Sequence, residues 1–241
     1  MHSTFNFNSN TKNQEKFYSK YVIPHQISRD VAVDLGSNVG FFVLDNWLSF
    51  KSIFAIDASY QNFCETLKKV LAMRIKYSDK HLVGTDGSAA VPGDQVACFN
   101  LAAAKNSGEI IKVFKHAWSA ESVSCMTNKE MFHAQYKDWT EAREPFHNVF
   151  TISLEDLYKL FDVDYIDYLK IDIEGAEYDF LFGKDLSKIG AIGLELHGTF
   201  GQEKKNEMKE YLSKYFEIYD VQYDNDAPGH SVITYINKEL A

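Results

Sequence analysis

The sequence predicts an α/β fold: a doubly wound, mostly parallel sheet with a C-terminal antiparallel hairpin. Three features predict this fold. Short apolar segments alternate with segments that carry apolar residues at helical spacing, as in chains that build a parallel sheet. A glycine-rich turn at residues 36–40 separates the first strand from the first helix. Two segments with strand alternation, at about 216–223 and 230–236, close the chain around a turn at residues 225–229.

The expected elements follow in strand–helix order. The expected strands are, in chain order, 31–35, 52–56, 96–101, 109–114, 168–173, 191–196, 216–223 and 230–236. The expected helices are 41–50, 61–75, 176–182 and 203–216. Residues 115–148 show no clear periodicity, and a stretch of that length is typical of a functional insertion or of a helix whose pattern is hidden.

Length and composition indicate one domain over residues 1–241. The chain is 45% hydrophobic and 24% charged, which is ordinary for a globular protein. Its length is one that a single α/β domain commonly reaches. Residues 1–28 are polar and rich in asparagine, so we expect them to form an N-terminal arm before the domain proper.

Charge and cysteine content restrict the partners and the compartment. The net charge is −9 and no basic tract is visible, so we expect no nucleic acid partner. The three cysteines are far apart, which indicates reduced thiols and a cytoplasmic setting. No apolar run has membrane-spanning length, so we expect no membrane partner. The sequence leaves the oligomeric state open.

The turn after the first strand has the composition of a ligand-binding loop. Gly36 and Gly40 allow a sharp turn and a close approach of a ligand. Phe41 stands where a dinucleotide-binding loop has its third glycine, which disfavours NAD. Asp57 ends the next strand, where a carboxylate can accept hydrogen bonds from ribose hydroxyls. Asp34 and Asp57 would repel a pyrophosphate but would attract a cofactor that carries a sulfonium and a free amino group.

A second motif lies at the expected strand 168–173. Strand alternation places Lys170, Asp172 and Glu174 on one side of the backbone. A lysine and carboxylates at the end of a buried strand are unusual on packing grounds alone. Since the carboxyl ends of parallel strands share one edge of the sheet, we expect these groups to face the same crevice as Gly36 and Asp57.

Both motifs resemble those of the FkbM family of methyltransferases. The first reads VDLGSNVG at residues 33–40, and the second reads YLKIDIEGAE at residues 168–177. Weaker matches are Asn100–Ala103 with Gly108-Glu109, Thr151–Leu157, and Glu195-Leu196-His197. The resemblance covers about residues 30–198, and family members differ at 115–148, which we expect to be an acceptor-side insertion.

The resemblance implies a class I methyltransferase (Rossmann-like) fold. It also implies transfer of a methyl group from S-adenosylmethionine to an oxygen, often a hydroxyl of a sugar, a glycan or a small natural product. The cofactor-binding residues that it implies are Asp34, Gly36, Ser37, Asn38 and Gly40 at the amino-acid end, Asp57 and Ala58 at the ribose, and Asn100 and Ala102 at the adenine.

Five residues are candidate catalytic groups, since a hydroxyl attacks poorly while it is protonated. They are Lys170, Asp172, Glu174, Glu195 and His197, all expected at strand ends. The dipole of the following helix would also stabilise Glu174, and an exposed loop histidine is the commoner identity of a residue such as His197. A divalent cation held by Asp172, Glu174 and Glu195 would suit their chemistry, but their spacing matches no recognised metal signature, so no metal ligand is predicted.

Two other functions compete with this interpretation. An RNA ribose 2′-O-methyltransferase uses a similar combination of lysine and acidic residues, and the negative charge of this chain counts against it. A non-catalytic cofactor-binding protein is the alternative from another class, and the intact set of Asp34, Gly36, Asp57 and Asp172 argues against it.

Overall fold

The computed structural model of the chain describes residues 21–77, 82–83, 89–90, 95–117, 123–126, 146–197, 201–223 and 231–241. Most of the expected N-terminal arm and the expected turn at 225–229 lie outside the described residues. Within the described part, no helix is long and apolar enough to cross a membrane.

A seven-stranded sheet forms the centre of the molecule, in the order β12-β13-β11-β10-β1-β2-β5. Its strands are β1 (Val31–Leu35), β2 (Ser52–Ile56), β5 (Val96–Phe99), β10 (Ile166–Ile171), β11 (Ile189–Glu195), β12 (Phe216–Tyr223) and β13 (Ser231–Asn237). The strands run parallel except β13, which pairs antiparallel with both β11 and β12. The mostly parallel sheet and the C-terminal hairpin that the sequence predicts are therefore both present.

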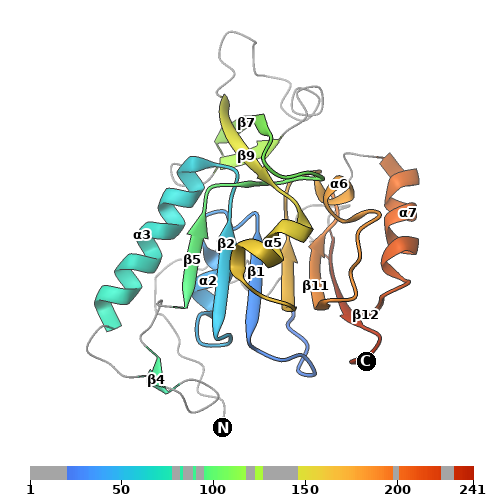
Figure 1. Ribbon diagram of the computed structural model, residues 1–241, viewed down its shortest axis with the longest axis horizontal. Helices are drawn as coiled ribbons and strands as arrows, with labels where there is room; N and C mark the ends of the chain where they lie inside the picture. The colour runs from blue at the N-terminus through green and yellow to red at the C-terminus, as the bar shows by residue number, and fades with distance from the viewer. Residues whose placement is uncertain are drawn as a thin grey trace.

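Helices cover both faces of this sheet (Figure 1). One face packs against α2 (Phe41–Asn46) and α3 (Tyr60–Tyr77) through alternate strand residues such as Ala32 and Tyr168. The other face packs against α5 (Leu154–Phe161), α6 (Glu177–Leu181) and α7 (Gly201–Leu212) through the intervening residues, such as Val33 and Leu169. Because strand side chains alternate between the two faces of a sheet, a strand that is apolar throughout contributes side chains to a hydrophobic core on each face.

A second, smaller sheet lies above the carboxyl edge of the central one (Figure 1). It has the order β6-β9-β7-β8, with β6 at Ala102–Ala103, β7 at Ile110–Ala117, β8 at Val123–Met126 and β9 at Phe146–Ile152. Two short strands, β3 (Leu82–Val83) and β4 (Ala89–Ala90), pair separately. The expected strand at 109–114 therefore exists, but it belongs to this small sheet.

The sequence did not predict the helix α5, and β10 begins and ends two residues before the strand expected at 168–173. Other differences concern the ends of elements. The helix expected at 203–216 ends at Leu212, because Phe216 is the first residue of β12 and is buried in the main core. The helix expected at 41–50 ends at Asn46. Trp47 and Phe50 follow the end of this helix and pack in the same hydrophobic core as its residues Phe42 and Val43. The expected irregular stretch 115–148 starts inside β7 and ends inside β9.

Candidate functional site

The loop between β1 and α2 has a backbone that favours glycine. Gly36, Asn38 and Gly40 have φ angles of 72°, 51° and 82°, in the left-handed region. The amides of Gly36 and Ser37 both donate to the carbonyl oxygen of Ile56, at 2.9 and 3.0 Å, so the loop is tied to the end of β2. A Cβ atom on Gly36 would collide with the carbonyl oxygen of Asp172, which shows how closely this loop lies against the end of β10.

Asp57, directly after β2, holds the next loop and faces the first. Its Oδ2 accepts a hydrogen bond from the Asn38 amide at 2.7 Å, and its Oδ1 accepts one from the Ser59 amide at 2.7 Å. Burial raises the pKa of Asp57 to about 7, although the hydrogen bonds from Ser59 and Asn38 act in the opposite direction. The Asn100 side chain donates to the carbonyl oxygens of Asp57 and Ala58, at 2.9 and 3.1 Å, and so fixes this turn from β5.

A cleft opens between these loops, the end of β10 and the small sheet. It contains about 650 Å³ of empty space, including the part that is open to solvent. Its lining residues are Gly36, Asn38, Ile56, Asp57, Ala58, Asn62, Leu101, Ala102, Ala103, Val113, Asp172, Ile173, Glu174 and Ala176. The cleft lies beyond the carboxyl ends of β1, β2 and β10, where open α/β sheets bind ligands.

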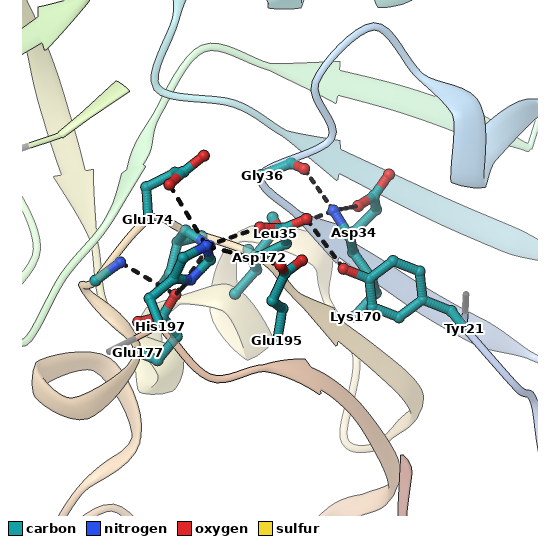
Figure 2. Close-up of polar contacts among 12 residues, drawn as sticks. Tyr21, Asp34, Leu35, Gly36, Lys170, Asp172, Glu174, Glu177, Glu195 and His197 are labelled. Atoms are coloured by element: carbon teal, nitrogen blue, oxygen red, sulfur yellow. Dashed lines mark hydrogen bonds and ion pairs between the residues drawn. The ribbon is translucent and has the colours of Figure 1, made fainter. Parts of the chain in front are cut away.

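Lys170 and Asp34 form a buried ion pair behind the cleft. They are register partners on β10 and β1, and the Lys170 Nζ lies 3.0 Å from the Asp34 Oδ1. The ammonium group also donates to the carbonyl oxygens of Leu35 and Gly36, and thus holds the start of the glycine-rich loop (Figure 2). Burial raises the pKa of Asp34 although the charge of Lys170 lowers it.

Four carboxylates surround His197 at the ends of β10 and β11 (Figure 2). The His197 Nδ1 donates to Glu177 Oε1 at 2.7 Å, because a carboxylate oxygen can only accept this bond. The His197 Nε2 therefore faces Glu174 Oε2 at 3.4 Å, Asp172 Oδ1 at 3.8 Å and Glu195 Oε1 at 3.9 Å. Burial lowers the pKa of His197, but the hydrogen bond and charge of Glu177 and the charges of Asp172 and Glu174 outweigh it and raise the pKa to about 10.

Glu177 also organises the segment that joins β10 to α6. Its Oε1 accepts hydrogen bonds from the amides of Ile173 and Gly175, at 3.3 and 3.1 Å. Glu174, between them, has a φ angle of 53°, which is uncommon for a residue other than glycine. The position of Glu174 at the cleft is thus imposed by its neighbours.

Tyr21 reaches the same group from the N-terminal side. Its hydroxyl donates to Asp172 Oδ2 at 3.0 Å, and its ring lies 5.4 Å from the Lys170 ammonium. Burial and the charges of Asp172 and Glu195 raise the pKa of Tyr21, which keeps the phenol protonated and able to donate. A Cβ on Gly193 of β11 would collide with the Tyr168 hydroxyl and would lie 3.0 Å from the Tyr21 ring, so glycine there leaves room for both tyrosines.

The structure brings the sequence-predicted residues together in two layers. Those that line the cleft are Gly36, Asn38, Asp57, Ala58, Ala102, Asp172 and Glu174. Those that lie behind it are Asp34, Ser37, Gly40, Asn100, Lys170, Glu195 and His197. The expectation that His197 is exposed is wrong: it is buried at the end of β11 and pairs with the buried Glu177.

Three residues of the site were not predicted. Glu177 is the last residue of the second motif, so its membership of that motif could have identified it. Asn62 lines the cleft and donates to Asp57 Oδ1 at 3.3 Å, but in the sequence it is one polar residue on a helix. Tyr21 precedes Asp172 by 151 positions, and no local pattern connects them.

Comparison with known proteins agrees with this geometry. Residues 34–220 match the sequence model of the methyltransferase FkbM domain. No curated protein matches the chain. The methyltransferase FkbM from Methylobacillus flagellatus KT has a similar structure, with 14% identity and a TM-score of 0.51. The alignment covers 90% of this chain and 47% of that one, so the chain spans about half the length of that protein.

Two other solved structures are similar over most of the chain. One is M. capricolum TrmK in complex with S-adenosyl-homocysteine, with 12% identity, a TM-score of 0.43 and coverage of 95% of this chain and 69% of that one. The other is Aeropyrum pernix fibrillarin with bound S-adenosyl-L-methionine, with 12% identity, a TM-score of 0.41 and coverage of 93% and 74%. The family match extends over both motifs of the cleft and over most of the central sheet. The chain therefore belongs to the FkbM family of S-adenosylmethionine-dependent methyltransferases, with the class I methyltransferase fold.

Proposed function

We propose that this protein is an O-methyltransferase that methylates a hydroxyl of a sugar, a glycan or a small natural product in the cytoplasm. One observation carries the proposal: the carboxylates of Asp172 and Glu174 line the same cleft as Gly36, Asn38 and Asp57. Groups that accept a proton thus share a cavity with the loops to which we assign the cofactor. The three well-separated cysteines support the cytoplasmic setting.

The residues of the cleft fit the proposed cofactor. Gly36 and Asn38 leave backbone exposed at the turn, and the side chains of Ala58 and Ala102 are small and apolar, which suits an adenosyl group. The Asp57 carboxylate is buried at the cleft without a basic side chain among its hydrogen-bond donors, so it retains lone pairs for ribose hydroxyls. In this proposal, Asp34, Ser37, Gly40 and Asn100 support these loops from behind.

The proposed reaction is a displacement at carbon. S-adenosylmethionine, when bound, supplies a methyl group on a positively charged sulfur. An acceptor oxygen would displace S-adenosylhomocysteine from that methyl group, and the contribution of the protein to such a displacement would be mostly the positioning of the two reactants. The acceptor hydroxyl gives up its proton to Asp172 or Glu174, whose side chains are about one quarter exposed. Glu195 and His197 are buried behind them, and the His197 Nε2 lies 3.4 Å from Glu174 Oε2 and 3.8 Å from Asp172 Oδ1.

The small sheet supports an acceptor site on the far side of the cleft. Val113 of β7 lines the cleft, and β7 pairs with β8 and β9. The strand β8 lies within the segment 115–148, and β7 and β9 overlap its two ends. We therefore propose that 115–148 is an acceptor-side insertion within a single domain over 1–241. Its residues 118–122 and 127–145 lie outside the described part of the chain.

The test combines a panel of acceptors with two variants. Purified protein is incubated with S-adenosylmethionine and with sugars, glycans, phenolic natural products or RNA, and S-adenosylhomocysteine formation is measured. We expect Asp172→Asn to lower turnover about 100- to 10,000-fold with little change in cofactor Kd, because it keeps the size of the side chain and removes the base. Asp57→Ala should weaken cofactor binding, and saturating cofactor should restore much of the turnover.

Two outcomes would contradict the proposal. Turnover with RNA alone would favour the ribose 2′-O-methyltransferase, against which the net charge of −9 counts. Cofactor binding without turnover on any acceptor would favour a non-catalytic cofactor-binding protein. If Asp172→Asn weakened cofactor binding and left saturated turnover unchanged, Asp172 would belong to the cofactor site.

A further inference from the structure

We propose that Asp172, Glu195 and His197 bind a divalent metal ion. One ligand atom from each of the three lies within 4.8 Å of the others. Asp172 follows β10, while Glu195 and His197 lie at the end of β11, and these two strands are hydrogen-bonded neighbours. The three side chains therefore converge because the sheet places its strand ends at one edge.

The distances within this group suit ligands of one ion better than hydrogen-bond partners. The His197 Nε2 lies 3.8 Å from Asp172 Oδ1 and 3.9 Å from Glu195 Oε1, which is too long for a hydrogen bond. Two ligand atoms at about 2.1 Å from one ion are about 3.0–3.4 Å apart in octahedral or tetrahedral geometry, so these side chains would move slightly closer together around an ion. Nε2 is directed into the group because Nδ1 donates to Glu177, and a carboxylate behind a ligating histidine is typical of metal sites.

The charge around His197 supplies an independent argument. Asp172, Glu174, Glu177 and Glu195 all lie within 4 Å of the imidazole nitrogens, and an imidazolium would contribute a single positive charge. Lys170 is already paired with Asp34. Glu177 is wholly buried, and its Oε2 has no hydrogen-bond partner among the described residues. A buried carboxylate oxygen without a partner is costly, and a cation of higher charge beside His197 would offset that cost.

The donor set indicates the class of metal. Two carboxylates and one imidazole suit Mn²⁺ or a related first-row divalent ion. Asp172 also lines the cleft, so the ion would lie at the edge of the proposed acceptor site. There it would lower the pKa of an acceptor hydroxyl. Only this role rests on the proposed function, because binding of the ion can be measured without any acceptor.

The first test measures Mn²⁺ binding to the chelator-treated protein by electron paramagnetic resonance. We expect one site per chain, and a Kd at least about tenfold weaker in Glu195→Gln and in His197→Gln, since each removes one ligand. Glu203→Gln makes the same change at an exposed position on α7 and should leave the Kd unchanged. The absence of Mn²⁺ binding at millimolar concentration would overturn the proposal, as would binding that neither ligand variant weakens.

A second readout needs no variant and so does not depend on how the variants fold. Pulsed electron paramagnetic resonance of the wild-type complex should show coupling of Mn²⁺ to an imidazole nitrogen. A bound ion without nitrogen coupling would exclude His197 and overturn the site. Bound Mn²⁺ with that coupling in a protein that methylates no hydroxyl acceptor would support the metal site and contradict the proposed function.

Discussion

Asp34 and Asp57 are two buried carboxylates that the protein stabilises in different ways. Asp34 has a lysine partner within 3.0 Å, whereas Asp57 relies on the amides of Asn38 and Ser59. The first arrangement holds the glycine-rich loop through Lys170, and the second leaves a carboxyl group that titrates at the cleft. Each difference leads to a measurable effect.

Affinity for S-adenosylhomocysteine should depend on pH through Asp57. Its pKa of about 7 means that only about one tenth of the groups are ionised at pH 6. If the ionised form accepts the ribose hydroxyls, the Kd should be about tenfold weaker at pH 6 than in the plateau above pH 8. Calorimetric titrations at several pH values check this, with Asp57→Asn as the control that loses the dependence. A Kd that stays constant in the wild type contradicts this role for Asp57.

The same pKa predicts how Asp57 affects stability without ligand. The folded-state pKa lies above the value of 3.8 for an exposed aspartate, so the folded protein retains a proton that the unfolded chain has lost. The contribution of Asp57 to the free energy of unfolding is therefore greatest below about pH 4 and falls as the pH rises to about 7, by up to about 1.4 kcal/mol per pH unit. Cofactor binding and stability should thus respond to pH in opposite directions.

The ion pair of Lys170 and Asp34 should show strong coupling between its two members. Lys170→Met leaves the Asp34 carboxylate buried without a cation, and we expect a loss of about 3–5 kcal/mol in the free energy of unfolding. The double variant Asp34→Asn with Lys170→Met removes both charges and should be more stable than Lys170→Met alone. Urea unfolding at neutral pH measures both. Equal stability of the single and double variants would show that the pair is not coupled.

At the scale of elements, the site depends on the contact between the β1–α2 loop and the end of β10. Gly36 and Gly183 both have positive φ angles. A Cβ on Gly36 would overlap the backbone carbonyl of Asp172, whereas a Cβ on Gly183 would meet no atom within 4 Å. Gly183→Ala should cost about 1–2 kcal/mol in the free energy of unfolding, which is the cost of the backbone conformation alone. Gly36→Ala should cost more than about 3 kcal/mol and should abolish cofactor binding, because the loop and Asp172 must separate. Thermal unfolding of the two variants with and without S-adenosylhomocysteine tests this. Equal effects of Gly36→Ala and Gly183→Ala would show that the loop and Asp172 can separate at little cost in free energy.

The elements of the central sheet could be predicted from the sequence because they are buried on both faces. Apolar runs bounded by glycine or aspartate gave β1 and β2 with the bounds that the structure has. The small sheet was harder to predict. Strand β9 exposes Phe146 and Phe150 and buries Val149 between them, so apolar residues lie on both of its faces and no alternation is visible. Contacts such as Tyr21 with Asp172 depend on tertiary structure and leave no local pattern.

At the scale of the whole molecule, the cleft lies where the strand order reverses. From β1 the chain moves outward through β2 and β5, and it then returns to the other side of β1 through β10 and β11. The loops that follow β1 and β10 therefore separate from each other at their tips, which creates the crevice. The small sheet is inserted between β5 and β10 and borders that crevice.

Replacing residues 127–140 with a short Gly/Ser linker tests the proposed role of the insertion. We expect nearly unchanged affinity for S-adenosylhomocysteine and a loss of methyl transfer of at least about 100-fold, because the acceptor would no longer be positioned. A matched replacement of residues 225–229, between β12 and β13, should leave both unchanged. If the first replacement removes cofactor affinity and the thermal transition together, the segment is part of the core.

The position of β13 has a consequence for the order in which the sheet can assemble during synthesis. β13 lies between β11 and β12, and among the described residues β12 pairs with β13 alone. When the ribosome has just made β12, that strand has nowhere to pair, and the edge of β11 is open. The pairing is completed only after Ser231–Asn237 have left the exit tunnel. Until then the nascent chain exposes an unpaired strand edge, and such edges favour intermolecular association.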